Sequence, residues 1–419
     1  MPAPPAALAP YRVLDLTTEI GQYCGRAFAE MGADVIKVEP TGGDAVRRIG
    51  PFAGDLPGPE RSLYWAVLNA GKKSITCDIE KEAGRVLFRH LLKRADLVLE
   101  SYPPGYLASL GLDYDSLRAE HPSLVWVSIT GFGQDGPYKE YRWSELVGLA
   151  LGGLLYLWGD EDRPPVRARS PQAYYQASLG AAAGAMVALY HARRTGVGQR
   201  IDASMQEIVT FSLAGPGGIT GFWPLEGRNI TRSGPRLNIG DVRWRVFYEC
   251  RDGHVATGGL FGPHTGRLVE LMKRDDSAGL LADPRWLSAT RNPPLSGQWR
   301  CSQEENDAAE EIFSEWLRRY SRDELLQIAR ENELLIFPVL TVAENLANDQ
   351  MKHRGYFREV EQRRAGGRVT FPGPPVQLSA TPWRVTGAVA APGEHNEEIY
   401  GALALSADEQ RTLRAQGVV

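Results

Sequence analysis

Three consecutive segments decide the fold class: YRVLDL at residues 11–16, GQYCGRAFAEMG at residues 21–32 and DVIKVE at residues 34–39. The two outer segments are short and rich in Val, Leu and Ile, which is typical of buried strands. The middle segment repeats large apolar residues at helical spacing, so it predicts a helix between the strands. A strand, a helix and a second strand within 30 residues indicate a parallel βαβ unit.

The same alternation continues along the chain. Further strands are expected at residues 74–79, 96–101, 124–129 and 200–205, with helices at 81–94 and 181–192. Small residues crowd the second of these helices and favour close packing against a neighbour. This order predicts an α/β fold in which helices cover both faces of a parallel sheet, as in a Rossmann-like domain.

A dinucleotide cofactor is not expected in this domain. The turn after the first strand reads TTEIGQYCG at residues 17–25 and has no G-x-G-x-x-G fingerprint. Without those glycines the backbone cannot approach a pyrophosphate closely. The sequence therefore argues against NAD.

The length of 419 residues indicates two domains. We expect a large domain at 1–210, a linker rich in Gly, Pro and Arg at 211–235, and a smaller α/β domain at 236–345. The smaller domain should contain a hairpin that turns at Asp252-Gly253 and a helix at 308–331. A second linker is expected at 346–382, and residues 383–419 should return to the large domain, ending in a helix near 407–416.

Composition narrows the functional class. A formal net charge of −4 argues against nucleic acid as a partner. No apolar run reaches the length of about 18 residues that a membrane span needs, and MPAPPAALAP is no secretory signal. The four cysteines (24, 77, 250 and 301) are scattered without metal-ligand spacing. We therefore expect a cytoplasmic protein that binds no metal.

Several motifs recur in one order along nearly the whole chain. They are VLDL at 13–16, GADVIKVEP at 32–40, GGD at 42–44, KKS at 72–74, ITGFGQDGPY at 129–138, TGVGQ at 195–199, PVLT at 338–341 and GEHN at 393–396. In this order the motifs resemble the class III CoA-transferase (CaiB/BaiF) family. That family includes formyl-CoA transferase, carnitine CoA-transferase and the 2-methylacyl-CoA racemase.

The resemblance implies transfer of coenzyme A from an acyl-CoA to a carboxylic acid. It also implies a homodimer whose two chains are interlocked like rings, with CoA lying along the large domain. Because CoA phosphates are strongly anionic, basic residues near the resembling positions are candidate CoA contacts. With two neighbouring polar positions, the candidates are Arg47, Lys72, Lys73, Ser101, Tyr102 and Arg142.

The carboxylate on which the family's transfer chemistry depends is missing. In the transferases an Asp attacks the donor thioester, and in this sequence its position, 21 residues before Thr195, is Tyr174. Residues 163–201 contain no Asp or Glu, so no shift in alignment restores the nucleophile. A phenol with an ordinary pKa near 10 does not replace a carboxylate at neutral pH, although it can donate a hydrogen bond.

One acidic residue of the family site is retained as Glu145. We expect Glu145 and Tyr174 to be the catalytic residues, and three interpretations stay open. The first is CoA transfer with a non-standard active site. The second is an acyl-CoA isomerase, racemase or lyase that uses Glu145 as its base. The third is a catalytically silent CoA-binding subunit that pairs with a relative bearing the Asp.

Overall fold

The computed structural model describes residues 6–214, 231–239, 242–258, 264–284, 301–362, 367–387 and 389–419, and the single residues 223, 227, 229, 260 and 286. The chain forms two compact units. Unit 1 comprises Met1–Leu155, Ala168–Arg228 and Asp349–Val419, and unit 2 comprises Tyr156–Arg167 and Asn229–Asn348. Most of the linker expected at 211–235 lies outside the described residues.

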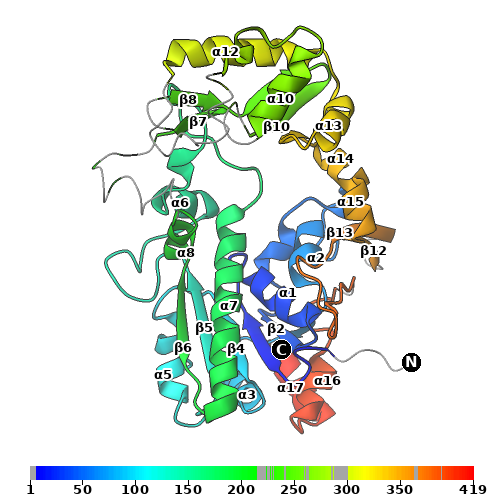
Figure 1. Cartoon of the computed structure of the whole chain (residues 1–419). Coiled ribbons are helices and arrows are strands. Elements are labelled where there is room, and N and C mark those ends of the chain that lie inside the picture. Colours follow the sequence, from blue (N-terminus) through cyan, green and yellow to red (C-terminus); the bar gives the residue numbers. More distant parts are fainter. Residues whose placement is uncertain are drawn as a thin grey trace. The chain divides into compact units, whose positions relative to one another are not determined.

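Unit 1 is built on a six-stranded sheet of order β3-β2-β1-β4-β5-β6, and every neighbouring pair is parallel (Figure 1). The expected α/β, Rossmann-like fold is confirmed. The strands, which are almost wholly buried except β6, are β1 (Arg12–Leu16), β2 (Asp34–Glu39), β3 (Lys73–Thr76), β4 (Leu97–Glu100), β5 (Val125–Thr130) and β6 (Arg200–Ser204).

The strand order reverses between β1 and β4, and in open parallel sheets ligands bind at the carboxyl ends of the strands at such a reversal. Two hydrogen bonds join the loops that leave these strands. The Thr18 N–H donates to Ser101 Oγ at 2.6 Å, and the two side-chain hydroxyls lie 2.9 Å apart. This edge of the sheet is therefore where a functional site is expected.

Helix α7 (Gln172–Thr195) is the longest helix and runs along β5 and β6 beside α1 (Gln22–Glu30) and α8 (Met205–Phe211) (Figure 1). Its small residues form the buried face, as expected. The sequence prediction of a helix at 181–192 was wrong at its start, because α7 begins nine residues earlier. Pro171 stands at the N-cap and offers no capping side chain, so the usual local signal is absent.

The other helices of the first 155 residues are short, apart from α3. They are α2 (Leu63–Asn69), α3 (Glu82–Leu92), α4 (Tyr106–Ser109), α5 (Tyr114–Leu117) and α6 (Glu145–Leu151). Helix α3 packs Leu87, Phe88 and Leu91 into the core beneath β3 and β4. Helix α6 packs against α7 and α8 and follows the loop that leaves β5.

The C-terminal segment joins unit 1. Helix α16 (Asn396–Ala402) packs on β3, where the Tyr400 hydroxyl donates to the carbonyl of Thr76, and α17 (Ala407–Ala415) follows. The linker expected at 346–382 instead contains α15 (Asp349–His353) and an antiparallel hairpin of β12 (Phe357–Gln362) and β13 (Gly367–Pro372). Phe371 and Val360 bury this hairpin against Ala66 and Ala70 of α2 and its C-cap, a tertiary contact that local proline content does not reveal.

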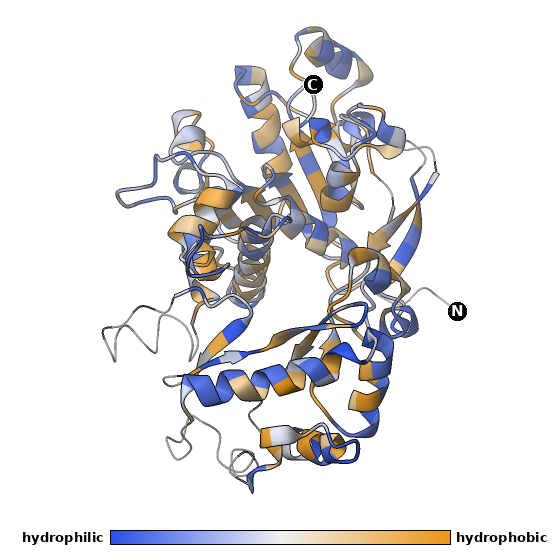
Figure 2. Ribbon diagram, turned by 90° about the horizontal axis from the view of Figure 1, so that it is seen from above, coloured by the Kyte–Doolittle hydropathy of each residue, from blue (hydrophilic) through white to orange (hydrophobic). Residues whose placement is uncertain are grey.

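Unit 2 contains a three-stranded antiparallel sheet and a separate two-stranded antiparallel sheet. The strands are β7 (Arg236–Ile239), β8 (Val242–Arg245), β9 (Phe247–Cys250), β10 (Gly253–Thr257) and β11 (Ile336–Pro338). The helices are α10 (His264–Lys273), α12 (Gln303–Arg318), α13 (Arg322–Glu331) and α14 (Val342–Ala347). Helices α10, α12 and α13 each bury one face in the core of unit 2. Figure 2 shows hydrophobic and hydrophilic residues alternating along the helical ribbons of the chain.

Three expectations for this region were wrong in detail. The β9–β10 hairpin pairs Cys250 with Gly253, so its turn is Arg251-Asp252, one residue earlier than expected. The helix expected at 308–331 is two helices, because Ser321 starts a second one with a capping box to Glu324. Unit 2 also includes Tyr156–Arg167, where the Arg232 guanidinium donates to the carbonyl of Asp160.

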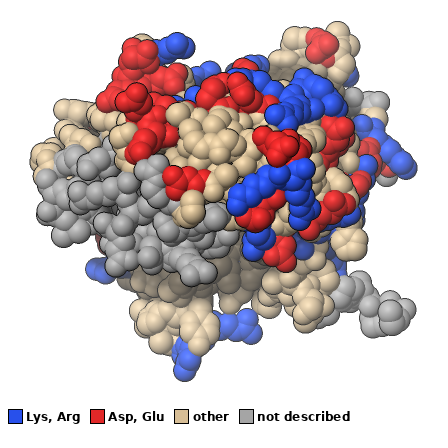
Figure 3. Space-filling model, turned by 45° about the horizontal axis from the view of Figure 1, so that its top comes forward, with Lys and Arg blue, Asp and Glu red and all other residues tan. Residues whose placement is uncertain are grey.

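None of the helices in the described ranges combines the length and the hydrophobicity that crossing a membrane would require. On the face shown in Figure 3, Lys and Arg side chains lie next to Asp and Glu side chains. Opposite charges therefore offset one another locally on that face.

Candidate functional site

The two residues expected to be catalytic meet at the first turn of α7, which contains Tyr174 and which Glu145 contacts. Glu145, the first residue of α6, directs its carboxylate at this turn: Oε1 accepts the N–H of Ala173 and Oε2 accepts the N–H of Tyr174, each at 3.2 Å. Glu145 therefore caps α7 from another helix and compensates for the missing local cap. A carboxylate at a helix N-terminus is also favoured by the helix dipole.

The environment of Glu145 acts on its pKa in two directions. Burial raises the pKa above its ordinary value, while the backbone N–H donors of Ala173 and Tyr174 lower it in part. The net direction is upward. Because both carboxylate oxygens accept hydrogen bonds from α7, Glu145 is poorly disposed to attack a thioester in this arrangement.

Tyr174 is half-buried beside two carboxylates. Burial, and then the charge of Glu19, raise the pKa of Tyr174 to about 12. Its phenol therefore stays protonated at neutral pH and can donate a hydrogen bond. Tyr174 cannot act as an anionic nucleophile under these conditions.

A second carboxylate, Glu19, comes from the loop after β1. The Tyr64 hydroxyl, on α2, donates to Glu19 Oε1 at 2.8 Å, and burial together with this bond raises the pKa of Tyr64. The Ser178 hydroxyl of α7 anchors the same loop, because it donates a hydrogen bond to the carbonyl of Ile20 at 2.8 Å. The loop, α2, α6 and α7 thus bring two carboxylates and two phenols to one region.

Aromatic rings form the neighbouring wall. Tyr175 packs edge to face on Tyr23, with ring centroids 5.3 Å apart. The guanidinium of Arg26 lies 5.7 Å from the centre of the Tyr23 ring and forms a buried ion pair with Glu30 at 2.9 Å. The wall is therefore fixed from behind by a buried charged pair.

The structure does not support Lys72 as a phosphate contact. Lys72 is 4% exposed, and its ammonium donates to Asp15 Oδ2 at 2.7 Å, to the Gln22 carbonyl at 2.7 Å and to Asn69 Oδ1 at 2.8 Å. An ammonium has three donors, so none is left for a ligand. Gly25 makes room for the pair, because a Cβ there would lie 2.1 Å from Asp15 Oδ2.

Arg47 is likewise committed to the core. It is 1% exposed and donates two hydrogen bonds to the Glu39 carboxylate, from Nε at 2.7 Å and from Nη2 at 2.6 Å. Its guanidinium also lies 4.1 Å from the centre of the Trp65 ring. The sequence suggested a CoA contact, whereas the structure shows a buried bidentate ion pair.

The other four predicted contacts are placed differently. Lys73 lies at the amino end of β3, away from the reversal edge, and pairs with Asp34 at 3.1 Å and Glu398 at 2.7 Å. Ser101 and Tyr102 follow β4 at the carboxyl edge, and the Tyr102 ring packs at a tilt against that of Tyr106, with centroids 4.8 Å apart. Arg142 is exposed in the loop between β5 and α6, three residues before Glu145. Ser101, Tyr102 and Arg142 therefore share the edge that carries the candidate site.

Sequence reasoning did not include Tyr64 in the site. No local pattern identifies Tyr64, which reaches the region only because α2 packs on α1. Within the described residues, no three His, Cys, Asp or Glu side chains are grouped so that they could hold a metal ion.

Comparisons with known proteins agree on one family. The family described as CoA-transferase family III matches residues 8–396. The chain is 34% identical over 414 residues to Succinyl-CoA:(R)-benzylsuccinate CoA-transferase subunit BbsE of Thauera aromatica, covering 98% of this chain and 97% of that protein. It is 30% identical over 417 residues to Succinyl-CoA–L-malate CoA-transferase alpha subunit of Chloroflexus aurantiacus, covering 98% and 92%.

A solved structure agrees with these relatives. The crystal structure of a CAIB/BAIF family protein from Brucella suis matches with a TM-score of 0.79 and 28% identity. The match covers 95% of this chain and 99% of that one.

Proposed function

Because this chain belongs to CoA-transferase family III, we propose that it is one subunit of a transferase whose nucleophilic Asp is supplied by a second chain. The subunit binds acyl-CoA and shapes the site. The second chain is a relative of the same fold that carries the Asp.

One observation carries this proposal: counted back from Thr195, the sequence has Tyr174 where the family resemblance leads us to expect the nucleophile. Tyr174 is a protonated phenol, and the nearby Glu145 has both oxygens engaged by the backbone of α7. Covalent transfer needs a carboxylate free to attack the thioester carbonyl while CoA leaves as its thiolate. Residues 163–201 supply none. Two relatives are named as subunits, which supports a multi-chain enzyme.

The names of those relatives also suggest the donor. Both name succinyl-CoA, so we infer that succinyl-CoA donates CoA to a second carboxylic acid. CoA phosphates would lie near Arg142, and Ser101 and Tyr102 would line the carboxyl edge. The interlocked pair implied by the family remains a prediction, with the Asp-bearing chain as the second ring.

An exchange assay tests the proposal. The purified chain is incubated with succinyl-CoA and a panel of dicarboxylic acids, alone and after co-expression with an Asp-bearing relative from the same cell. We expect new acyl-CoA only from the co-expressed pair, and loss of that product when the relative's Asp is changed to Ala. Efficient exchange by this chain alone would contradict the proposal.

A second candidate rests on the raised pKa of Glu145. In it the chain turns over an acyl-CoA by isomerisation or cleavage, with Glu145 as base and Tyr174 as hydrogen-bond donor. Glu145→Gln should then lower the rate by roughly a hundredfold or more, and Tyr174→Phe should also reduce it. Full activity in both variants would exclude this candidate.

A further inference from the structure

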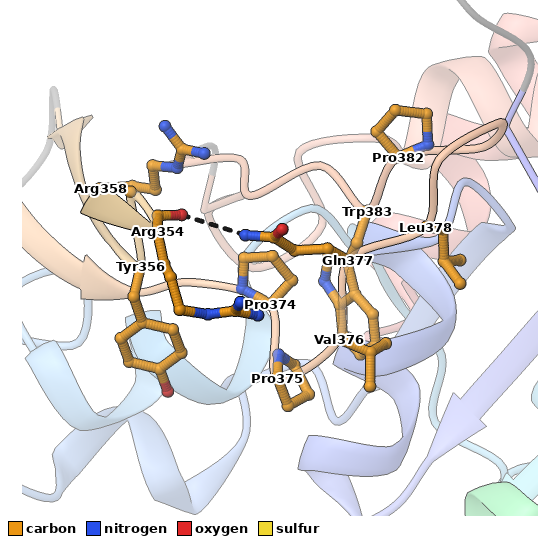
Figure 4. A pocket seen from close by; sticks show the side chains of 11 residues that line it. Arg354, Tyr356, Arg358, Pro374, Pro375, Val376, Gln377, Leu378, Pro382 and Trp383 are labelled. Carbon is orange, nitrogen blue, oxygen red and sulfur yellow. Dashed lines mark hydrogen bonds between the residues drawn. The ribbon is translucent and has the colours of Figure 1, made fainter. Parts of the chain in front are cut away.

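A pocket of about 270 Å³ lies in the C-terminal part of unit 1. Two segments form this pocket: the residues between α15 and the start of β12, and the proline-rich segment that follows β13 (Figure 4). Its walls are Arg354, Gly355, Tyr356, Arg358, Pro374, Pro375, Val376, Gln377, Leu378, Pro382 and Trp383.

Hydrogen bonds anchor the apolar wall to α1. The indole N–H of Trp383 donates to Glu30 Oε2 at 2.7 Å, and Glu30 is itself paired with Arg26 at 2.9 Å. Arg26 also donates to the carbonyl of Pro372, just before the lining prolines, at 3.2 Å. A flat ring and proline faces held in this way can bind a planar group without losing much conformational entropy.

The polar side of the pocket is positive. Within the described part of the chain, the guanidinium of Arg354 has no ion-pair partner, while its backbone carbonyl accepts the Gln377 amide at 3.1 Å. Figure 4 shows the Arg354 side chain extending toward the prolines and Trp383, whereas Arg358 points away from them. An unpaired guanidinium beside an apolar wall favours a carboxylate attached to a planar body.

We propose that this pocket binds a small aromatic carboxylate, with its carboxylate on Arg354 and its ring against Trp383 and the prolines. A volume of about 270 Å³ lies just below the range of roughly 300–1,000 Å³ typical of drug-sized ligands, so a single ring fits and a whole CoA does not. The proposal is independent of CoA transfer.

The test uses fluorine NMR titration of the purified full chain with 4-fluorobenzoate. We expect saturable binding, and binding at least about tenfold weaker for Arg354→Ala, because the charge-assisted contact is lost. 4-Fluorobenzyl alcohol keeps the ring without the charge and should bind comparably weakly to both proteins. Lys352→Ala is the matched control, since it removes an exposed positive charge from α15 outside the pocket.

Equal affinity of 4-fluorobenzoate for wild type and Arg354→Ala would overturn the proposal. Displacement of 4-fluorobenzoate by inorganic phosphate at equal concentration would show that the pocket selects charge alone, which overturns the aromatic part. The assay contains neither CoA nor a second chain. Its failure is therefore distinguishable from failure of the proposed transferase.

Discussion

The adjacent residues Lys72 and Lys73 should lose different amounts of stability on the same substitution. Lys72→Met keeps most of the side-chain volume but leaves Asp15, which is fully buried, without its closest cation. Removing one partner of a buried ion pair costs about 3–5 kcal/mol. Lys37 still lies 3.7 Å from the other Asp15 oxygen, so we expect the lower end, about 3 kcal/mol. Lys73→Met breaks half-exposed pairs worth about 0–1 kcal/mol.

Thermal unfolding followed by circular dichroism measures the difference. At roughly 2 °C per kcal/mol for a large domain, Lys72→Met should lower the midpoint by about 6 °C and Lys73→Met by about 2 °C or less. If Lys72 instead contacted a CoA phosphate, its substitution would weaken CoA binding and leave unfolding almost unchanged. Equal midpoints for the two variants would refute the assignment of Lys72 to the core.

Three further predictions concern CoA binding, pH and assembly. Arg142→Glu should weaken CoA binding about tenfold or more by calorimetry. Arg118→Glu, at the exposed C-cap of α5, should not, and equal losses would remove the Arg142 contact. Burial raises the pKa of Glu100 to about 7, so the folded state binds this proton more tightly than the unfolded state. The resulting stability, about 3 kcal/mol at most, is present below pH 4.5 and lost as pH rises through 7. The free energies of unfolding measured with urea at pH 5 and at pH 8 should therefore differ less for Glu100→Gln than for wild type. An equal difference in the two proteins would contradict this role of Glu100. Tagged and untagged chains of an interlocked assembly should not exchange on mixing, and rapid exchange would exclude interlocking.

The strands were predictable because burial on both faces leaves an unambiguous apolar run. The predicted bounds of 34–39 match β2, and the other strands of the sheet differ by a few residues at their ends. Helix α7 was harder, because its cap comes from Glu145, 27 residues earlier, rather than from a local Ser, Thr, Asp or Asn. The break in the helix expected at 308–331 was visible in the sequence, since Ser321 and Glu324 have capping-box spacing.

The site was only partly accessible to sequence reasoning. The family resemblance selected Glu145 and Tyr174, and the fold brings these two residues into contact. The sequence could not separate buried cations from exposed ones, because Lys72 lies just before β3 and turns inward while Lys73 starts the strand and turns outward. The pairing of Arg47 with Glu39 was hidden for the same reason, since burial is a property of the tertiary fold.

The most direct test of the missing nucleophile is mass spectrometry of both chains during turnover. The co-expressed pair is mixed with succinyl-CoA, quenched and separated, and the intact mass of each chain is measured. Our account predicts that the Asp attacks succinyl-CoA to form a mixed anhydride and CoA thiolate, and that the thiolate then attacks the Asp carbonyl and releases succinate. The Asp-bearing chain should therefore carry a covalent CoA thioester, and this chain should carry no adduct. A CoA adduct on Glu19 or Glu145 of this chain would contradict it.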